Sequence, residues 1–413
     1  MGKKMQVYLF VAAISINGVA RLLAKEYRLI SPAMLTLVSF LTIAAAALAL
    51  TKLITNFKLE NTYIRFMIII FLIYQLITIA RGFTLDFIEL KGFIQSEYLF
   101  WPFVIPIFIF FDKDLVTFAH FFKAIYVVAI FGRLLSLAQP KLISQKSTAE
   151  MVMHAYAFAC GFILLNAYYL PKKMRNVAFI ALAIGIGAFI FLARRNGIVS
   201  YSALIMAAVA LNMRNTPASK TMRIFPIVGI IIMAGLLSLG YLPKSFTAKI
   251  EDRLTEDSRS TVFDDFFAGM KDDEIFGKGM NGKYYSPTGG SGLTDEGELK
   301  DSVDFRDVIE NGYLQQYLNG GIVYIVLFGL VMLPAVFYGL FRSNNQFTKA
   351  SAIIVLLWLI DMGIFGLPRL TMEYLLVWIC AGICYTKTLR DKTDDEVADT
   401  FLNYEEYENS MVY

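Results

Sequence analysis

The chain has 413 residues, 57% of them hydrophobic, and a mean hydropathy of +0.57. This composition excludes a soluble globular protein and indicates a membrane protein. The formal net charge of +4 is unevenly distributed: residues 243–312 hold 16 acids and 9 bases, residues 387–413 hold 8 acids and 3 bases, and the rest of the chain holds 10 acids and 26 bases. Such a basic excess is expected where Lys and Arg anchor the cytoplasmic ends of spans or bind an anionic substrate.

Apolar runs predict an all-α polytopic membrane protein with about 12 transmembrane helices, since a span takes about 20 mostly apolar residues. The first run follows Lys3 and Lys4 and lacks a small-residue cleavage site, so we expect it to be retained as a span. The runs lie at about 5–24, 31–51, 62–80, 97–111, 115–138, 148–170, 176–193, 197–213, 224–242, 313–341, 351–367 and 371–386.

The basic residues of the short connections indicate the orientation of these runs. With both termini in the cytoplasm, the inner connections carry more Lys and Arg than the outer ones, as the positive-inside rule requires. Residues 1–242 then hold nine helices, 243–312 one large outer loop containing short helices, 313–386 three helices and 387–413 an acidic cytoplasmic tail.

Two arginines are on the outer side against this charge bias. Arg194 and Arg195 are at a tight outer hairpin between two apolar runs, followed by Asn196 and Gly197. Guanidinium groups stay charged and offer forked donors that suit phosphate oxygens. The other interpretation is that both side chains extend to lipid headgroups, as arginines at membrane interfaces commonly do.

The outer loop adds further basic and aromatic side chains. Arg259 leads into residues 261–271, whose apolar residues have the spacing of an amphipathic helix that could lie on the membrane surface. Residues 276–282 contain three glycines and predict a tight turn, more readily an ordinary turn than a phosphate cradle. Arg306 is near the end of the loop.

Glu310 is the candidate base. It comes just before Asn311 and the apolar run that begins at Tyr313, so its carboxylate should lie at a helix amino terminus near the membrane face. The helix dipole tends to keep it ionised there, as a base requires. The alternative is an acid that only complements the dipole. Asp361, an acid within an apolar run, fits a proton-coupled transporter as well.

Together these features resemble the O-antigen polymerase and ligase family. The resemblance rests on many spans, an arginine at an outer hairpin in mid-chain, a large late outer loop with an arginine followed by Gly277-Lys278-Gly279, and Glu310-Asn311-Gly312-Tyr313-Leu314 followed by Gly320-Gly321. Ligases of the family carry a histidine where this chain has Glu310, and the histidines here, His120 and His154, are both in predicted spans. The polymerase branch is therefore favoured.

The resemblance implies a glycosyltransferase in the bacterial inner membrane with its large loop in the periplasm. Its partners would be undecaprenyl-diphosphate-linked oligosaccharides as donor and acceptor, membrane lipids, a chain-length regulator and a flippase, and we expect no nucleic acid. No metal or cofactor is expected, because fixed arginines can stabilise the diphosphate charge that soluble enzymes often offset with Mg²⁺.

Site residues follow from the same resemblance. Glu310 would be the general base. The diphosphate ligands would be Arg194 or Arg195 and Arg259, with Arg81, Arg306 and Arg369 as weaker candidates for the same pocket. Side chains that could contact sugars are Asn311, Tyr313, Tyr284 and Tyr285.

Three alternatives stay open. A ligase would transfer the glycan to lipid A core. A lipid-linked glycan flippase or transporter would need a central cavity lined by buried charges such as Arg133 and Asp361, and such proteins generally lack so long a loop late in the chain. A chain-length or assembly subunit would need few buried charges.

Overall fold

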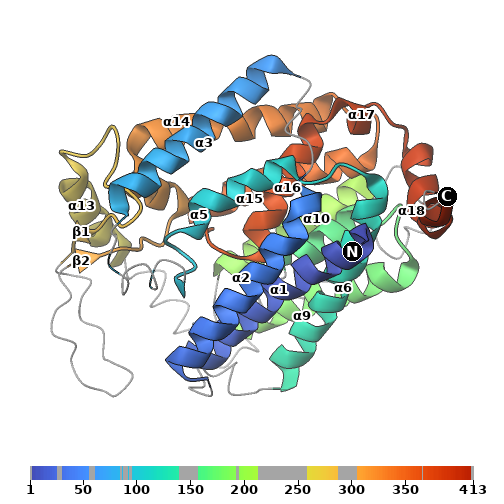
Figure 1. Ribbon diagram of the computed structural model, residues 1–413, viewed down its shortest axis with the longest axis horizontal. Coiled ribbons are helices and arrows are strands. Elements are labelled where there is room, and N and C mark those ends of the chain that lie inside the picture. Colours follow the sequence, from blue (N-terminus) through green and yellow to red (C-terminus); the bar gives the residue numbers. More distant parts are fainter. Residues whose placement is uncertain are drawn as a thin grey trace, which may run out of the picture.

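The computed structural model describes residues 2–25, 30–54, 61–83, 86, 92, 95–138, 157–191, 195–212, 258–286, 305–364 and 366–410. These residues are helical almost throughout (Figure 1). The first part contains α1 (Lys3–Lys25), α2 (Pro32–Leu53), α3 (Thr62–Gly82), α5 (Trp101–Val104), the 3₁₀ helix η1 (Ile105–Phe110), α6 (Leu115–Ala138), α9 (Lys172–Phe191) and α10 (Arg195–Asn212). The second contains α13 (Ser258–Met270), β1 (Tyr284–Tyr285), β2 (Phe305–Arg306), α14 (Gly312–Phe341), α15 (Gln346–Ile364), α16 (Met372–Tyr385), α17 (Lys387–Arg390) and α18 (Asp394–Ser410).

The structure confirms an all-α fold with helices that can cross a membrane. Four described helices are long and apolar enough for this: Ala33–Thr51, Thr62–Gly82, Gly312–Phe341 and Gln346–Ile364. The total of 12 spans stays a prediction, and the predicted run at 224–242 is outside the described residues. The predicted run at 97–111 forms two short helices, α5 and η1, with Pro102 and Pro106 near their starts.

The helix ends gather into two groups at opposite ends of the molecule (Figure 1). At one end, the Lys3 ammonium lies 2.9 Å from a carboxylate oxygen of Asp112. The backbone N–H of Gln346 there donates to Asp394 at the start of α18, over 2.6 Å. Both chain termini are at this end, whereas α13, β1 and β2 are at the other (Figure 1).

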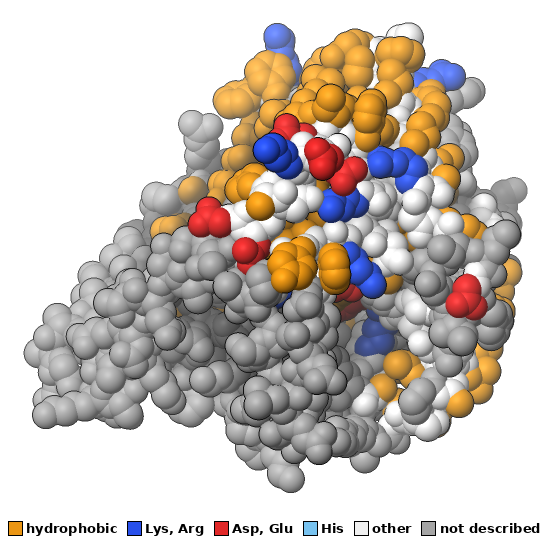
Figure 2. All heavy atoms as spheres, turned by 90° about the vertical axis from the view of Figure 1, so that its left-hand side faces the viewer, with side chains coloured by type: hydrophobic (Ala, Val, Ile, Leu, Met, Phe, Trp, Pro, Cys, Tyr) orange, Lys and Arg blue, Asp and Glu red, His pale blue; other side chains and the backbone are white. Residues whose placement is uncertain are grey.

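The helices expose hydrophobic faces, as expected for contact with lipid. Space-filling spheres show such a hydrophobic surface on the part of the molecule formed by α3 and α14 (Figure 2). In a soluble protein so much contiguous apolar surface would be unfavourable, and here it agrees with the membrane class. The exposed residues include Leu37, Phe40, Leu41, Leu48, Phe66, Ile73, Leu76, Val326, Leu333, Phe337 and Phe341.

A break in α14 joins the loop to the helices. Gly321 has φ 62° and ψ −164°, so the helix is interrupted there. The backbone of residues 274–279 fills the interruption: Ile322 N–H donates to the Glu274 carbonyl over 2.9 Å, and Lys278 and Gly279 donate to the carbonyls of Leu318 and Asn319 over 2.7 and 2.8 Å. Non-helical backbone is tolerated at membrane depth only where protein or water satisfies it, and this segment does so.

The predicted turn at 276–282 is confirmed, and its glycines pack against the backbone of the protein. Gly277 and Gly279 have φ of 67° and 84°. A Cβ on Gly277 would lie 2.5 Å from the Gly320 nitrogen. The glycines therefore permit the turn to approach the backbone of α14.

Gly321→Ala is expected to destabilise the protein. An added Cβ would lie 2.3 Å from the Ile275 carbonyl oxygen, and the backbone conformation is one that only glycine adopts readily. Strain and overpacking should together cost at least about 2 kcal/mol. Thermal unfolding in detergent measures the loss as a lower Tm.

Gly329→Ala is the matched control in the same helix, because the nearest atom to its added Cβ is 4.0 Å away, at Leu333. It should leave the Tm unchanged. Equal Tm values for the two variants would contradict the role given to the break.

Candidate functional site

The described parts of the loop form a small domain on the first turns of α14. Phe266 and Met270 of α13 are buried with Tyr284, Ile309 and Leu318 in one hydrophobic cluster. The helix predicted at 261–271 is thus confirmed. Its apolar side chains Phe266 and Met270 contact other residues of the protein. Figure 2 views this end of the molecule, where acidic and basic side chains lie beside one another below the hydrophobic surface.

Glu310 is exposed at the root of this domain, two residues before α14 begins. Asn311 caps the helix: its Oδ1 accepts from Leu314 N–H over 3.0 Å, and its Nδ2 donates to the Gly363 carbonyl at the end of α15 over 2.8 Å. The predicted position at a helix amino terminus is confirmed. The helix dipole favours a negative charge at this position.

Gln315 binds the backbone of the residues that precede Glu310. Its Oε1 accepts from Ile309 N–H over 2.9 Å, and its Nε2 donates to the Asp307 carbonyl over 3.1 Å. Gly312 lies so close to α15 that a Cβ would be 2.1 Å from the Gly366 carbonyl oxygen. Glu310 is therefore an exposed carboxylate on a backbone fixed from both sides, an arrangement suited to a base.

Arg306 and the tyrosines lie on the hairpin beside this root. Arg306 is paired with Tyr284 across the two short antiparallel strands. Burial raises the pKa of Tyr284, and the neighbouring Arg306 opposes this effect. The Tyr284 ring is fully buried against Phe266, with centroids 5.3 Å apart, whereas Tyr285 is 50% exposed. Of the two, Tyr285 has the accessible ring.

Two other predicted side chains are engaged by the protein. Arg81 donates from Nη1 to the Phe276 carbonyl over 2.5 Å and from Nη2 to the Gly277 carbonyl over 2.6 Å, which fastens the turn to the end of α3. The Tyr313 hydroxyl donates to the Leu359 carbonyl over 2.7 Å. Both residues thus hold the site in place.

Arg369 is at the same end of the molecule, inside the protein. It is buried between α15 and α16, donates to the Tyr98 hydroxyl over 3.1 Å and lies 3.8 Å from a Glu97 carboxylate oxygen. Glu97 and Tyr98 precede Arg369 by 272 and 271 positions in the sequence. No short-range spacing pattern could therefore have indicated this pairing.

Polar side chains continue inward from Arg369. Tyr98 and Pro368 line a cavity of about 10 Å³ with Gln316 and Asn319 of α14. The amide atoms of Gln316 and the Asn319 Oδ1 are buried and have no hydrogen-bond partner in the described part of the chain. A cavity of this size has room for about one water, which such groups would bind.

The remaining predicted arginines are placed only through their backbones. Arg194 is outside the described residues, Arg195 begins α10 and Arg259 is in the first turn of α13, and the side chains of the latter two are not described. Ser200, on the second turn of α10, donates to the buried Asp361 of α15. Since α15 also binds Asn311, the start of α10 and Glu310 are both next to the end of α15.

The described residues contain no group of three His, Cys, Asp or Glu side chains arranged to hold a metal ion. No family model, curated protein or solved structure matches the chain. Function is therefore inferred from the site.

Asn311→Ala is expected to loosen the backbone that carries Glu310. It removes the helix cap and the bond to Gly363, and the lost cap alone should cost about 1 kcal/mol. Hydrogen exchange followed by mass spectrometry should then become faster in residues 305–312.

Asn61→Ala is the control, because Asn61 caps α3 by accepting from Tyr63 and Ile64 N–H over 3.0 and 3.3 Å. It should lower the Tm by a similar amount without affecting exchange at 305–312. Unchanged exchange in Asn311→Ala would show that the cap does not hold this segment.

Proposed function

We propose that the protein is a polysaccharide polymerase of the O-antigen type, a glycosyltransferase that joins undecaprenyl-diphosphate-linked repeat units at the outer face of the bacterial inner membrane. The observation that carries the proposal is Glu310: an exposed carboxylate at the amino terminus of α14, with Asn311 and Gln315 fixing the backbone on either side. The helix α13 and the strands β1 and β2, which pack beside this segment, are at the end of the molecule opposite both termini, which fits cytoplasmic termini and a periplasmic loop (Figure 1).

In the proposed reaction a hydroxyl of the acceptor glycan attacks the anomeric carbon of the donor. Glu310 takes the hydroxyl proton as the new glycosidic bond forms. The bond from the anomeric carbon to the diphosphate oxygen breaks, and undecaprenyl diphosphate leaves with the bonding electrons. The donor glycan is thereby transferred in one step.

Cations must stabilise the charge that develops on the leaving diphosphate. Arg306 is four residues before Glu310 on the same root segment, and Arg259 is in the first turn of α13, which packs on that root. Arg194 and Arg195 precede or begin α10, whose first turns are joined to α15 through Ser200 and Asp361. Fixed guanidinium groups could stabilise the leaving group without a metal ion. Arg81 and Arg369, already engaged by carbonyls and by Glu97, are proposed to act by holding the site.

A transporter is the second candidate, and Asp361 favours it. The buried carboxylate accepts a hydrogen bond from Ser200, and an acid inside a membrane helix is typical of proton-coupled transport. Neither the small polar cavity beside Tyr98 nor a larger cavity between α1 and α2 is lined by Asp361. The exposed Glu310 therefore supports the enzyme better.

Glu310→Gln should abolish glycan transfer because the amide cannot accept the acceptor proton. Loss of a general base costs about 100- to 10,000-fold in rate. The measurement is the rate of glycan lengthening by purified protein supplied with a lipid-diphosphate repeat unit.

Asp307→Asn is the control for this variant, since Asp307 is an exposed acid on the same segment and its backbone carbonyl is retained. It should keep most of the parent rate. A folded Glu310→Gln protein that lengthens glycan at the parent rate would exclude this mechanism, and transfer only to lipid A core would identify a ligase.

Arg306→Gln should slow transfer by lowering the affinity for the diphosphate carrier. Loss of one charged hydrogen bond to phosphate is worth about 1.5–3 kcal/mol, or about 10- to 150-fold in kcat/KM. Lys283→Gln removes an exposed charge near the same hairpin and should change kcat/KM little. If the two variants behave alike, the effect of Arg306 is only long-range charge.

A further inference from the structure

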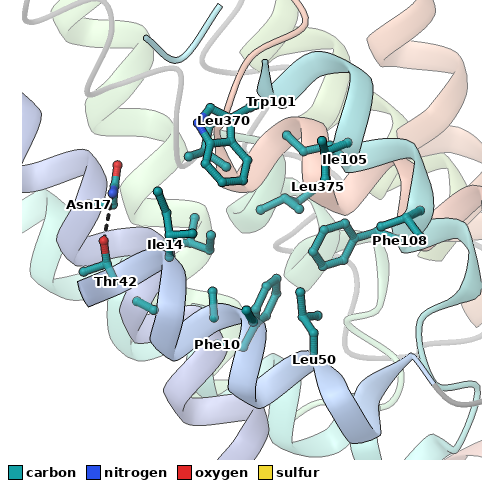
Figure 3. A pocket seen from close by; sticks show the side chains of 16 residues that line it. Phe10, Ile14, Asn17, Thr42, Leu50, Trp101, Ile105, Phe108, Leu370 and Leu375 are labelled. Carbon is teal, nitrogen blue, oxygen red and sulfur yellow. Dashed lines mark hydrogen bonds between the residues drawn. The ribbon is translucent and has the colours of Figure 1, made fainter. Parts of the chain in front are cut away.

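A hydrophobic cavity lies away from the site of Glu310. The α1–α2 hairpin encloses it together with α5, η1 and the start of α16, and its volume is about 160 Å³ (Figure 3). Its lining is apolar except at one edge, where Asn17 Nδ2 donates to Thr42 Oγ1 over 2.8 Å (Figure 3). An apolar cavity of about 150 Å³ takes up a molecule as large as benzene. This cavity therefore suits a hydrocarbon segment of about six carbons.

Arg21 is one helical turn beyond Asn17 on the same face of α1. Phe10, Ile14, Asn17 and Arg21 follow at helical spacing, and the first three line the cavity. The three guanidinium nitrogens of Arg21 are shielded from solvent, and none has a hydrogen-bond partner within the described part of the chain. A buried charge without hydrogen bonds is costly, so an anionic ligand there would relieve a large penalty.

The Glu97 carboxylate, which interacts with Arg21, makes its ion pair with a different cation. Among the described residues, Glu97 and Tyr98 interact electrostatically with Arg21. The Glu97 carboxylate, however, lies 3.8 Å from Arg369. Glu97 thus makes its ion pair with Arg369, and no hydrogen bond joins it to the Arg21 guanidinium.

The charged group and the cavity adjoin. Leu370 follows Arg369, donates its backbone N–H to the Glu97 carbonyl over 3.0 Å and lines the cavity. Trp101, four residues after Glu97, lines it as well (Figure 3). An amphiphile with a negative head and an apolar chain would match both parts.

We propose that Arg21 and this cavity bind one membrane glycerophospholipid, with its phosphodiester at Arg21 and part of an acyl chain in the cavity. A phosphodiester carries one negative charge, which matches the single guanidinium of Arg21, and its oxygens can accept the hydrogen bonds that this guanidinium donates, whereas a diphosphate carries more charge. The cavity requires an attached hydrocarbon, which free phosphate lacks. No lining residue belongs to segment 258–312, so the lipid would bind away from the proposed base Glu310.

Native mass spectrometry of the full chain in detergent tests the site with phosphatidylglycerol as the probe. The wild-type protein should retain one phosphatidylglycerol, and Arg21→Gln should lower its occupancy at least tenfold. Ala46→Phe, which fills the cavity from α2, should have the same effect although Arg21 is kept. Ala183→Phe, at an exposed position of α9, is the matched control and should retain the lipid.

Thermal unfolding gives an independent readout. Without added lipid, Arg21→Gln should have a higher Tm than the wild type, because it removes a buried charge that makes no hydrogen bond. Added phosphatidylglycerol should raise the Tm of the wild type and leave that of Arg21→Gln unchanged.

Three results would overturn the proposal. They are equal phosphatidylglycerol retention by wild type and Arg21→Gln, stabilisation by inorganic phosphate as large as by the lipid, and displacement of phosphatidylglycerol by an equal concentration of undecaprenyl diphosphate. If Arg21→Gln does not fold, Arg21→Lys and Ala46→Phe together test the lipid site in its place. Arg21→Lys should retain the lipid, and Ala46→Phe should lose it. None of these measurements depends on glycan transfer, so either proposal can fail alone.

Discussion

The need to satisfy backbone hydrogen bonds inside a low-dielectric protein determines how the described parts of this molecule fit together. The break of α14 at Gly321 leaves carbonyl and N–H groups without helical partners. Residues 274–279 supply most of the missing bonds, and the Tyr74 hydroxyl of α3 donates to the Gly320 carbonyl over 2.6 Å. Three parts of the chain far apart in sequence are thereby joined at one point, and the first turns of α14 are held rigidly beside it.

That rigidity explains how one helix can serve two chemically different surroundings. The exposed Glu310 precedes α14, and the packed loop domain lies on the first turns of the helix. Its inner side carries Gln316 and Asn319 toward Tyr98. The first environment is open to water and suits proton transfer, while the second is buried and suits fixed polar contacts. Arg369, paired with Glu97, belongs to the second environment.

The sequence predicted the positions of several helices and of one turn, but it did not predict the side-chain contacts between distant segments. Apolar run length predicted α1, α3 and α6 to within two residues, and glycine spacing predicted the turn at 276–282. The position of Glu310 before a helix followed from the change in hydrophobicity. Contacts between distant segments leave no such local pattern, so the use of Arg81 by the turn and of Arg369 by Glu97 could not be predicted. Arg21 was treated as part of an apolar run because one charge hardly changes the mean hydropathy of a window.

The contacts between α3, residues 274–279 and the break of α14 at Gly321 also constrain the order of assembly during synthesis. Gly82 at the end of α3 is 230 positions before Gly312 at the start of α14. At roughly 5–20 residues per second, on the order of 10–50 seconds separate their emergence from the ribosome. During that interval Tyr74 and Gln75, whose partners are Gly320 and Tyr324, must find water or other temporary partners. The amino-terminal helices can enter the membrane early, but the contacts of α3 with α14 form only after α14 has been inserted.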